Sequence, residues 1–237
     1  KYGDIHTGMD TWEEYVRSFG FGRKLDSDFV EEVNGLVPPS ELYDRKYNGR
    51  WNSLTVISLA IGQGELGASP LQMANLAATI ANRGHYYIPH VVKRIHDRDS
   101  IDARFYEKHM SRVESAHFDP IVEGMYRAVH NPGGTAQVAR VQGLDIFGKT
   151  GTAENPHGAD HSTFMCFAPR DNPRLAVSVY IEHGRFGASS AAPIASLIVE
   201  KYLTGEISRP YEVERMKNLQ INYPYYDREQ ARIDAGR

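Results

Sequence analysis

The stretch GLDIFGKTGTAEN, residues 143–155, matches two incompatible patterns. Its first eight residues fit the G-x-x-x-x-G-K-[ST] pattern of loops that cradle nucleotide phosphates. Such a loop needs a helix that begins at the Lys-Thr pair and receives the phosphate at its N-terminus. Here two glycines and a proline lie within the eight residues 151–158. Because glycine and proline disfavour helix, the sequence argues against a nucleotide site.

The same stretch is also a plausible β-strand that binds a peptide. Lys149 and Gly151 would then point to one face, and Thr150 and Thr152 to the other. A glycine inside a strand suits close approach of a ligand to the backbone. A cation beside two hydroxyls suits a carboxylate, and the ligand's amides would pair with the strand edge. The alternative is an exposed edge strand whose lysine only discourages aggregation.

The composition excludes several classes of protein. The 237 residues are 41% hydrophobic and 24% charged, which allows a sizeable core. A net charge of -3 without a Lys/Arg run argues against nucleic-acid binding. No apolar stretch of about 18 residues occurs, and any export signal is expected outside this chain. The single cysteine, Cys166, lies in an apolar segment without a nearby base and is expected to be a buried structural thiol.

Helical patterns dominate the first part of the chain. A capping box at Asp10-x-x-Glu13 predicts a short helix that ends at Gly20, followed by an irregular loop over 20–53. Ser69 as N-cap, with proline next and glutamine third, predicts a buried helix that stops before Gly84. A further helix is expected from Asp119, with an inner face of Phe118, Ile121, Val122, Met125 and Val129.

Strand patterns follow from about residue 141. Strands are predicted at 144–153, 162–168 and 175–181, with a hairpin turn over 169–173. A closing helix is predicted at 193–203, with Ile194, Leu197, Ile198 and Tyr202 on one face. The segment from residue 206 shows no periodic pattern that would predict a helix or a strand. Helices first and strands later indicate an α+β fold rather than a doubly wound sheet.

Residues 149–152 have the sequence K-T-G-T, which is the second pattern in the opening stretch. Three further segments belong with it: AIGQGELGASPLQMANLAATIANRG (60–84), GMYRAVHNPGGTAQVA (124–139) and HSTFMCFAPRDNPRLAVSVYIEHG (161–184). With GKTGTAEN they resemble, in order and spacing, the transpeptidase domain of class B penicillin-binding proteins over residues 10–205. Within that class the chain is most similar to the elongation-type penicillin-binding protein 2. The resemblance implies the penicillin-binding protein/β-lactamase-like fold.

The chain also departs from that family's pattern. The family carries S-x-x-K and S-x-N motifs before the G-Q-G segment, and neither occurs here. We therefore expect the C-terminal portion of a transpeptidase domain in residues 1–205 and a tail in 206–237. Residues 10–140 would be mainly helical, and 141–205 would hold the K-T-G strand, two more strands and the last helix. The absent first strands would leave an exposed sheet edge, so dimerisation there is a hypothesis.

The resemblance implies a serine-type peptidoglycan D,D-transpeptidase that cross-links stem peptides by acyl transfer. Lys149 and Thr152 would act in catalysis, with the Thr152 N–H as half of the oxyanion hole. Thr150, Gly151 and Thr152 would bind the substrate carboxylate, and His161 is a candidate substrate contact. This portion alone is expected to be inactive, because the nucleophile would lie outside it.

The resemblance also implies partners and a location. Stem peptides ending in D-Ala-D-Ala, β-lactam antibiotics and cell-wall elongation proteins are the expected partners. No cofactor is expected, and no metal either, because the spacing of His157, Asp160, His161 and His183 matches no standard site. The expected location is the periplasmic face of a bacterial inner membrane, with the anchor outside this chain. A non-catalytic penicillin-binding sensor or scaffold and a serine β-lactamase are the alternatives.

Overall fold

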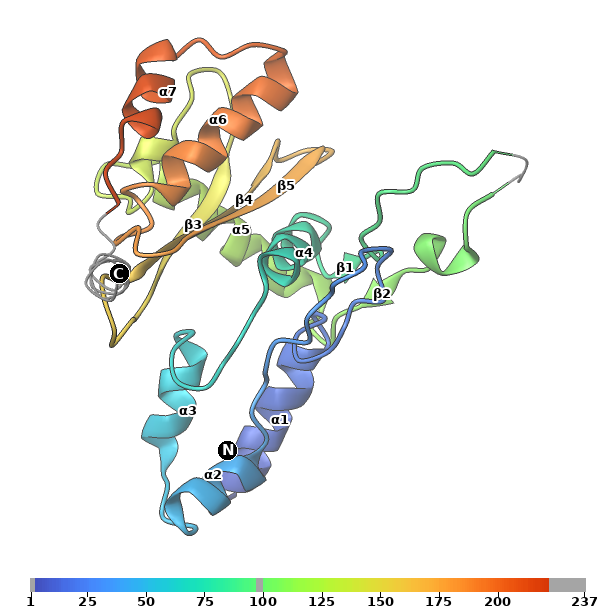
Figure 1. Cartoon of the computed structure of the whole chain (residues 1–237). Helices are drawn as coiled ribbons and strands as arrows, with labels where there is room; N and C mark the ends of the chain where they lie inside the picture. The colour runs from blue at the N-terminus through green and yellow to red at the C-terminus, as the bar shows by residue number, and fades with distance from the viewer. Residues whose placement is uncertain (1–2, 97–99, 222–237) are drawn as a thin grey trace, which may run out of the picture. The chain divides into compact units, whose positions relative to one another are not determined.

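A computed structural model of the protein describes residues 3–96 and 100–221 (Figure 1). The chain forms two compact units, Lys1–Ile121 and Val122–Arg237. Helices predominate in the first unit, and the second contains an antiparallel sheet covered by a helix, so the predicted α+β class is confirmed. No helix among the described residues is both long and apolar enough to cross a membrane.

The first unit contains helices and one short hairpin. Its helices are α1 (Ile5–Arg17), α2 (Ser40–Tyr47), α3 (Ser53–Ala60) and α4 (Pro70–Ala81). Strands β1 (His85–Tyr86) and β2 (His109–Met110) pair antiparallel, and single 3-10 turns occur at η1 (Ala103–Tyr106) and η2 (Ser115–His117). Residues 20–53 were predicted to be irregular throughout, so the position of α2 corrects that prediction.

The start of α1 also differs from the prediction. The helix begins at Ile5 rather than near Asp10, because the Asp4 side chain accepts a 2.9 Å hydrogen bond from the Thr7 N–H and serves as N-cap. The predicted start at Asp10 is therefore wrong. A second local capping signal, nearer the beginning of the chain, is the one that the helix uses.

Helix α4 begins as its sequence predicts. The Ser69 hydroxyl accepts a hydrogen bond from the Gln72 N–H, and the Gln72 side chain accepts one from the Ser69 N–H, which together make a capping box. The buried Gln72 amide also donates to the carbonyl oxygens of Gly20, Arg23 and Asn34 at 2.9–3.3 Å. This one side chain therefore fastens the loop before α2 to the start of α4.

The second unit is built on a three-stranded antiparallel sheet in the order β3-β4-β5. Helix α5 (Phe118–His130) begins in the first unit and continues into the second. The other elements of the second unit are η3 (Gln137–Ala139), β3 (Phe147–Ala153), β4 (His161–Ala168), β5 (Leu175–Ile181), α6 (Ala191–Thr204) and α7 (Pro210–Lys217). The three predicted strands are confirmed, and β5 has the predicted bounds. In the register, Gly151 pairs with Thr163, and Phe164 pairs with Val179.

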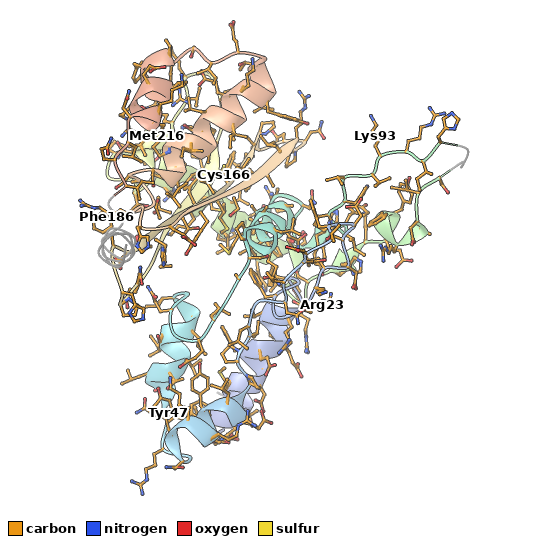
Figure 2. All side chains as sticks on the ribbon, in the orientation of Figure 1. Arg23, Tyr47, Lys93, Cys166, Phe186 and Met216 are labelled. Atoms are coloured by element: carbon orange, nitrogen blue, oxygen red, sulfur yellow. The ribbon has the colours of Figure 1, made fainter. Side chains whose placement is uncertain are left out.

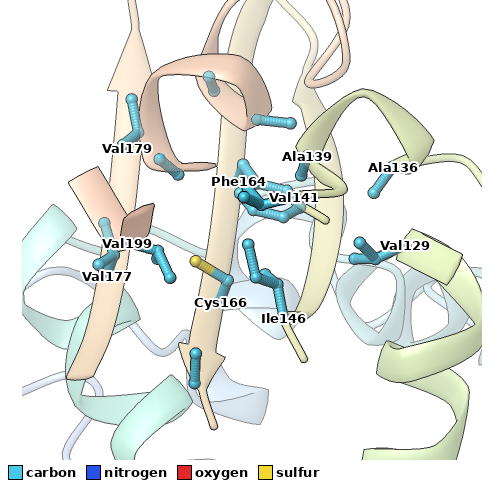
Figure 3. Close-up of a cluster of buried hydrophobic side chains, with 14 residues drawn as sticks. Val129, Ala136, Ala139, Val141, Ile146, Phe164, Cys166, Val177, Val179 and Val199 are labelled. Carbon is cyan, nitrogen blue, oxygen red and sulfur yellow. The ribbon is translucent and has the colours of Figure 1, made fainter. Parts of the chain in front are cut away.

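Helix α6 packs on β4 and β5 and closes the core of this unit (Figure 3). The core contains Phe164 and Cys166 from β4 and Ala191, Ala195 and Val199 from α6. Cys166 belongs to the central strand β4 (Figure 2) and is buried. Burial raises the pKa of its thiol to about 12, as expected for a structural residue.

The apolar residues predicted on one face of α6 differ in burial. Ile194 packs against the core, whereas Ile198 and Tyr202 are 44% and 54% exposed, and small residues elsewhere on the helix are buried. Small side chains let the helix approach the sheet closely, which the larger residues would prevent. Ile121 of α5 is likewise 52% exposed, although the other members of its predicted inner face, Phe118, Val122, Met125 and Val129, are buried.

Helix α7 lies in the segment that showed no period and is attached to α6 by a buried ion pair. Glu200 is 2% exposed and accepts hydrogen bonds from Ser208 and from the Arg209 guanidinium at 2.9–3.0 Å. Burial alone would raise the pKa of Glu200, but these hydrogen bonds outweigh it and hold the pKa below its usual value. The predicted tail beyond 221 lies outside the described residues.

His130, the last residue of α5, contacts the start of β3. Its ring stacks on Tyr126 with centroids 4.3 Å apart, and Nε2 lies 3.1 Å from the Ile146 carbonyl oxygen and 3.3 Å from the Ile146 nitrogen. Burial lowers the pKa of His130, and the contact with Ile146 opposes this shift only in part. The neutral ring is therefore the form that supports the entry of the chain into β3.

We predict that β3 loses protection in acid through His130. A folded-state pKa below the unfolded value of about 6.5 means that the unfolded chain binds the proton more readily. The stabilisation of the folded state by the neutral His130 ring is therefore complete above about pH 6.5, and it is lost as the pH falls through the folded pKa. Hydrogen exchange of 147–168, corrected for intrinsic rates, should accelerate from pH 7.5 to 5.5 more in the native protein than in His130→Gln. An equal acceleration in both would contradict this.

Candidate functional site

The K-T-G-T stretch forms strand β3, at the edge of the sheet. It pairs with β4 on one side, and among the described residues no strand pairs with its other side. No helix begins at Lys149, which confirms that this is not a phosphate loop. The register also gives the predicted alternation, since Lys149 pairs with Met165 on one face and Thr150 pairs with Phe164 on the α6 face.

Both glycines of β3 are required by close neighbours. A Cβ at Gly148 would lie 2.2 Å from the Phe164 ring, and a Cβ at Gly151 would lie 2.6 Å from the Thr163 methyl group. These distances are too short for any side chain. The two glycines therefore let the strand lie directly against its neighbours. Lys149 and Thr150, which lie between them, provide the side chains of this part of the strand.

Lys149 provides a positive charge at this edge. The side chain is exposed, and its Nζ donates a 2.7 Å hydrogen bond to the carbonyl oxygen of Thr150. Within residues 3–96 and 100–221, Lys149 forms no ion pair with a carboxylate of the protein. Its charge is therefore available to an anionic ligand.

Thr150 is held from two sides by residues that the sequence patterns did not single out as functional. Its hydroxyl donates a 3.1 Å hydrogen bond to the hydroxyl of Thr135, which follows the Gly133-Gly134 turn. A Cβ at Gly187, in the loop before α6, would lie 3.0 Å from the Thr150 Cβ and 2.8 Å from the Gly151 carbonyl oxygen. Thr135 could not be predicted as a neighbour of Thr150, because contact across 15 residues leaves no local pattern.

Thr152 pairs with Ser162, and the Ser162 side chain holds the loop between β5 and α6 in place. The buried Ser162 hydroxyl donates to the Phe186 carbonyl oxygen at 2.9 Å and accepts from the Ala191 N–H at 3.2 Å. The first turn of α6 and the loop that carries Gly187 are thereby fixed against β4. The exposed ring of Phe186 projects from this loop (Figure 2).

His161 occupies the first position of β4, opposite Ala153. It shares a face with Lys149 but lies about 13 Å further along, at about 3.3 Å per residue. Its Nδ1 accepts a 3.1 Å hydrogen bond from the His183 N–H, and its ring lies 5.2 Å from that of His183. The structure therefore places His161 at the far end of the strand, where it joins two loops.

The β3–β4 loop is held in place by polar contacts with the β5–α6 loop. The Asn155 side chain lies 3.2 Å from His183 Nδ1, and Arg185 donates its N–H to the Asp160 carbonyl oxygen at 2.8 Å. The Asn155 N–H is bonded to the Asp160 carboxylate at 3.1 Å. Among the described residues, no three His, Cys, Asp or Glu side chains gather closely enough to hold a metal.

A groove in the first unit is a competing candidate site. It has a volume of about 880 Å³, and its lining includes Trp12, Tyr15, Trp51, Asp4 and Asn52. Asp4 and Asn52 already serve as helix N-caps. The groove contains no pairing of a nucleophile with a base, whereas β3 combines a cation, hydroxyls and an unpaired backbone edge. We therefore assign the candidate site to β3.

Comparison with known proteins shows the family of this chain. The penicillin binding protein transpeptidase domain family model matches residues 4–200. The peptidoglycan D,D-transpeptidase MrdA of Acinetobacter baumannii is 32% identical over 232 residues, covering 91% of this chain and 34% of the relative. The crystal structure of Pseudomonas aeruginosa PBP2 in complex with WCK 5153 matches with a TM-score of 0.74 and 34% identity, covering 87% of this chain and 47% of that one.

A chain from a peptidoglycan synthase complex that coordinates polymerization and crosslinking matches with a TM-score of 0.70 and 29% identity, covering 85% of this chain and 34% of that one. The chain spans about a third of the length of the curated relatives it matches. The relatives confirm the expected resemblance to penicillin-binding protein 2. With 4–200 of its 237 residues matched, the chain belongs to the transpeptidase domain family of the penicillin-binding proteins.

Proposed function

We propose that this chain is the substrate-recognition part of a peptidoglycan D,D-transpeptidase. The observation that carries the proposal is strand β3. Among the described residues, Lys149 there forms no ion pair and no strand pairs with the outer edge, while the Thr150 hydroxyl is held by Thr135. Membership of the transpeptidase family and the resemblance to MrdA support the same activity.

The substrate proposed is a stem peptide that ends in D-Ala-D-Ala. Its backbone would lie along β3 as an added strand, with main-chain hydrogen bonds to the strand edge. Its terminal carboxylate would accept hydrogen bonds from the hydroxyls of Thr150 and Thr152 and would be attracted by Lys149. Gly151 removes the side chain that would keep the peptide away from the strand. β-Lactams carry a carboxylate on a rigid amide and would bind in the same way.

The proposed reaction is acyl transfer through a covalent intermediate. A serine hydroxyl attacks the carbonyl carbon between the two D-alanines, D-alanine leaves, and the amine of a second stem peptide takes the acyl group. The Thr152 N–H would donate one hydrogen bond to the oxyanion of each tetrahedral intermediate. No S-x-x-K occurs in the 237 residues. The nucleophile is therefore proposed to come from outside this chain, and this chain alone to be inactive.

The proposal includes a cellular location and partners for the enzyme. Cross-linking of peptidoglycan would take place on the periplasmic face of the inner membrane, which is the proposed location of the working enzyme. Cell-wall elongation proteins are its proposed partners in the longer form. The resemblance to a chain of a peptidoglycan synthase complex supports that assignment. No cofactor or metal is required, because serine acyl transfer needs only a nucleophile, a base and an oxyanion hole.

The first prediction from this proposal is that the isolated 237 residues will not be labelled covalently by a fluorescent penicillin. Acylation requires a serine activated by a nearby base, and no Ser has Lys three residues further on. The measurement is fluorescence of the protein band after denaturing electrophoresis, with heat-denatured chain as the background. Saturable labelling that is absent from the denatured control would overturn the proposal that the nucleophile is supplied from elsewhere.

The second prediction concerns Lys149→Ala in the longer protein that carries this chain and the nucleophile. The rate constant for acylation should fall about ten- to a hundredfold, since a hydrogen bond to a charged group contributes about 1.5–3 kcal/mol. Lys201→Ala is the matched control, because Lys201 is also exposed and donates to a nearby carbonyl, that of Gly205, at 2.6 Å. Equal acylation rates for the two variants would remove Lys149 from the site.

A further inference from the structure

The hydroxyl pair of Thr135 and Thr150 connects the recognition strand to the turn that follows α5. Thr150 belongs to β3, whereas Thr135 lies between α5 and η3. Their side-chain oxygen atoms lie 3.1 Å apart, although 15 positions separate the two residues in the sequence. Both residues belong to the second unit, so the contact is formed entirely within that part of the chain.

The backbone on both sides of Thr135 is fixed against α5. A Cβ at Gly134 would lie 2.3 Å from the Ala128 carbonyl oxygen, so glycine is needed where the chain passes the end of this helix. Ala136 is fully buried in the core (Figure 3), and its N–H donates a 2.9 Å hydrogen bond to the same Ala128 oxygen. Thr135 lies between these two anchored residues, and its side chain therefore starts from a fixed point.

The Thr150 side chain also has little freedom. Threonine is branched at Cβ, which restricts rotation about its first side-chain bond. The backbone of the loop before α6 passes directly against this side chain, because a Cβ at Gly187 would lie 3.0 Å from the Thr150 Cβ. The main remaining freedom is the direction in which the Thr150 hydroxyl points its proton, and Thr135 is placed to set that direction.

The direction of this hydrogen bond matters for the binding of a carboxylate. A hydroxyl has one proton to donate and two lone pairs that accept, whereas an ionised carboxylate only accepts. In the structure, Thr150 donates to Thr135, so its one proton is directed at Thr135. Thr150 can therefore donate to a carboxylate only when the bond reverses and Thr135 donates to Thr150.

A hydroxyl is the kind of partner that permits this reversal. A backbone carbonyl in the place of the Thr135 side chain would only accept and would hold the Thr150 proton permanently, and a backbone N–H would only donate. The Thr135 hydroxyl accepts when no ligand is bound and donates when one is. In the bound arrangement the two hydroxyls form a chain that ends on the carboxylate, and hydrogen bonds aligned in this way strengthen one another.

We propose that Thr135 is a positioning residue of the recognition site, which directs the Thr150 hydroxyl toward the terminal carboxylate of the ligand. This rests on the function proposed above, because the carboxylate of a stem peptide or a β-lactam is taken as the ligand of Thr150. Thr135 makes no contact with the ligand and acts only through Thr150. Its own position is set by the end of α5, through Gly134 and Ala136.

The test is the rate constant for acylation by benzylpenicillin, measured on the longer protein that carries this chain and the nucleophile. Thr135→Val keeps the branched shape, removes the hydroxyl and should lower the rate constant about three- to tenfold, the effect of one neutral hydrogen bond. Thr135→Ser keeps the hydroxyl and should stay within about twofold of the native rate constant. Thr204→Val is the matched control and should leave the rate constant unchanged. Thr204 is also exposed, and its hydroxyl donates a 2.8 Å hydrogen bond to the Glu200 carbonyl oxygen.

Two further comparisons distinguish positioning from a merely structural role. The double variant Thr135→Val/Thr150→Val should be acylated no more slowly than Thr150→Val, because Thr135 acts only through Thr150 and the two losses do not add. The second comparison uses the methyl ester of benzylpenicillin, which carries no anionic carboxylate. With the ester, the difference between the native protein and Thr135→Val should fall below about twofold, since hydrogen bonds to a charged acceptor are the strong ones.

The outcomes separate a failure of this inference from a failure of the proposed function. Native acylation of Thr135→Val, with slow acylation of Thr150→Val, would overturn the role of Thr135 and leave the carboxylate site standing. Native acylation of Thr150→Val would overturn the carboxylate site and the role of Thr135 with it. Additive losses in the double variant, or equal losses with the acid and the ester, would mean that Thr135 acts through folding, which also overturns the inference. Loss with valine, recovery with serine and no further loss in the double variant would support it.

Discussion

The candidate site depends on how closely strand β3 approaches its neighbours. Phe164 occupies the space where a side chain at position 148 would lie, the Thr163 methyl group does the same at position 151, and Gly187 lies against the Gly151 carbonyl oxygen. These contacts fix the strand on both faces without using its edge. Lys149 and Thr150, which lie between the two glycines of β3, are therefore presented from a rigid sheet, and no other described strand pairs with their backbone edge. A rigid support of this kind favours precise recognition of an extended peptide.

The strands were predicted from the sequence because their signals are local. The segment LAVSVYI is dense in β-branched residues, and β5 has the bounds expected for it. The same holds for α4, whose Ser69-Pro70-Leu71-Gln72 start contains the complete capping box. The rejection of a phosphate loop also rested on local chemistry, since glycine and proline after Lys149 prevent a helix there.

The start of α1 was missed although its signal, the Asp4 cap, is local. Other features could not be predicted because tertiary packing decides them. Helix α6 packs on the sheet through Ala191, Ala195 and Val199, whose small size brings the helix close, and not through Ile198 and Tyr202. The hydroxyl pair of Thr135 and Thr150 joins residues 15 positions apart, and no periodic pattern records such a contact. His161 was expected only as a candidate substrate contact, and its position along the strand follows from the register with Ala153.

The central claim is that β3 recognises a peptide by its terminal carboxylate. It is tested most directly by titrating the isotopically labelled chain with an N-acyl-D-Ala-D-Ala peptide and with the same peptide as its C-terminal amide. The free acid should shift the amide signals of Thr150, Gly151 and Thr152, and the Thr135 signal with them, whereas the C-terminal amide should leave them in place. Equal shifts with both peptides, or shifts confined to residues away from β3, would contradict the claim.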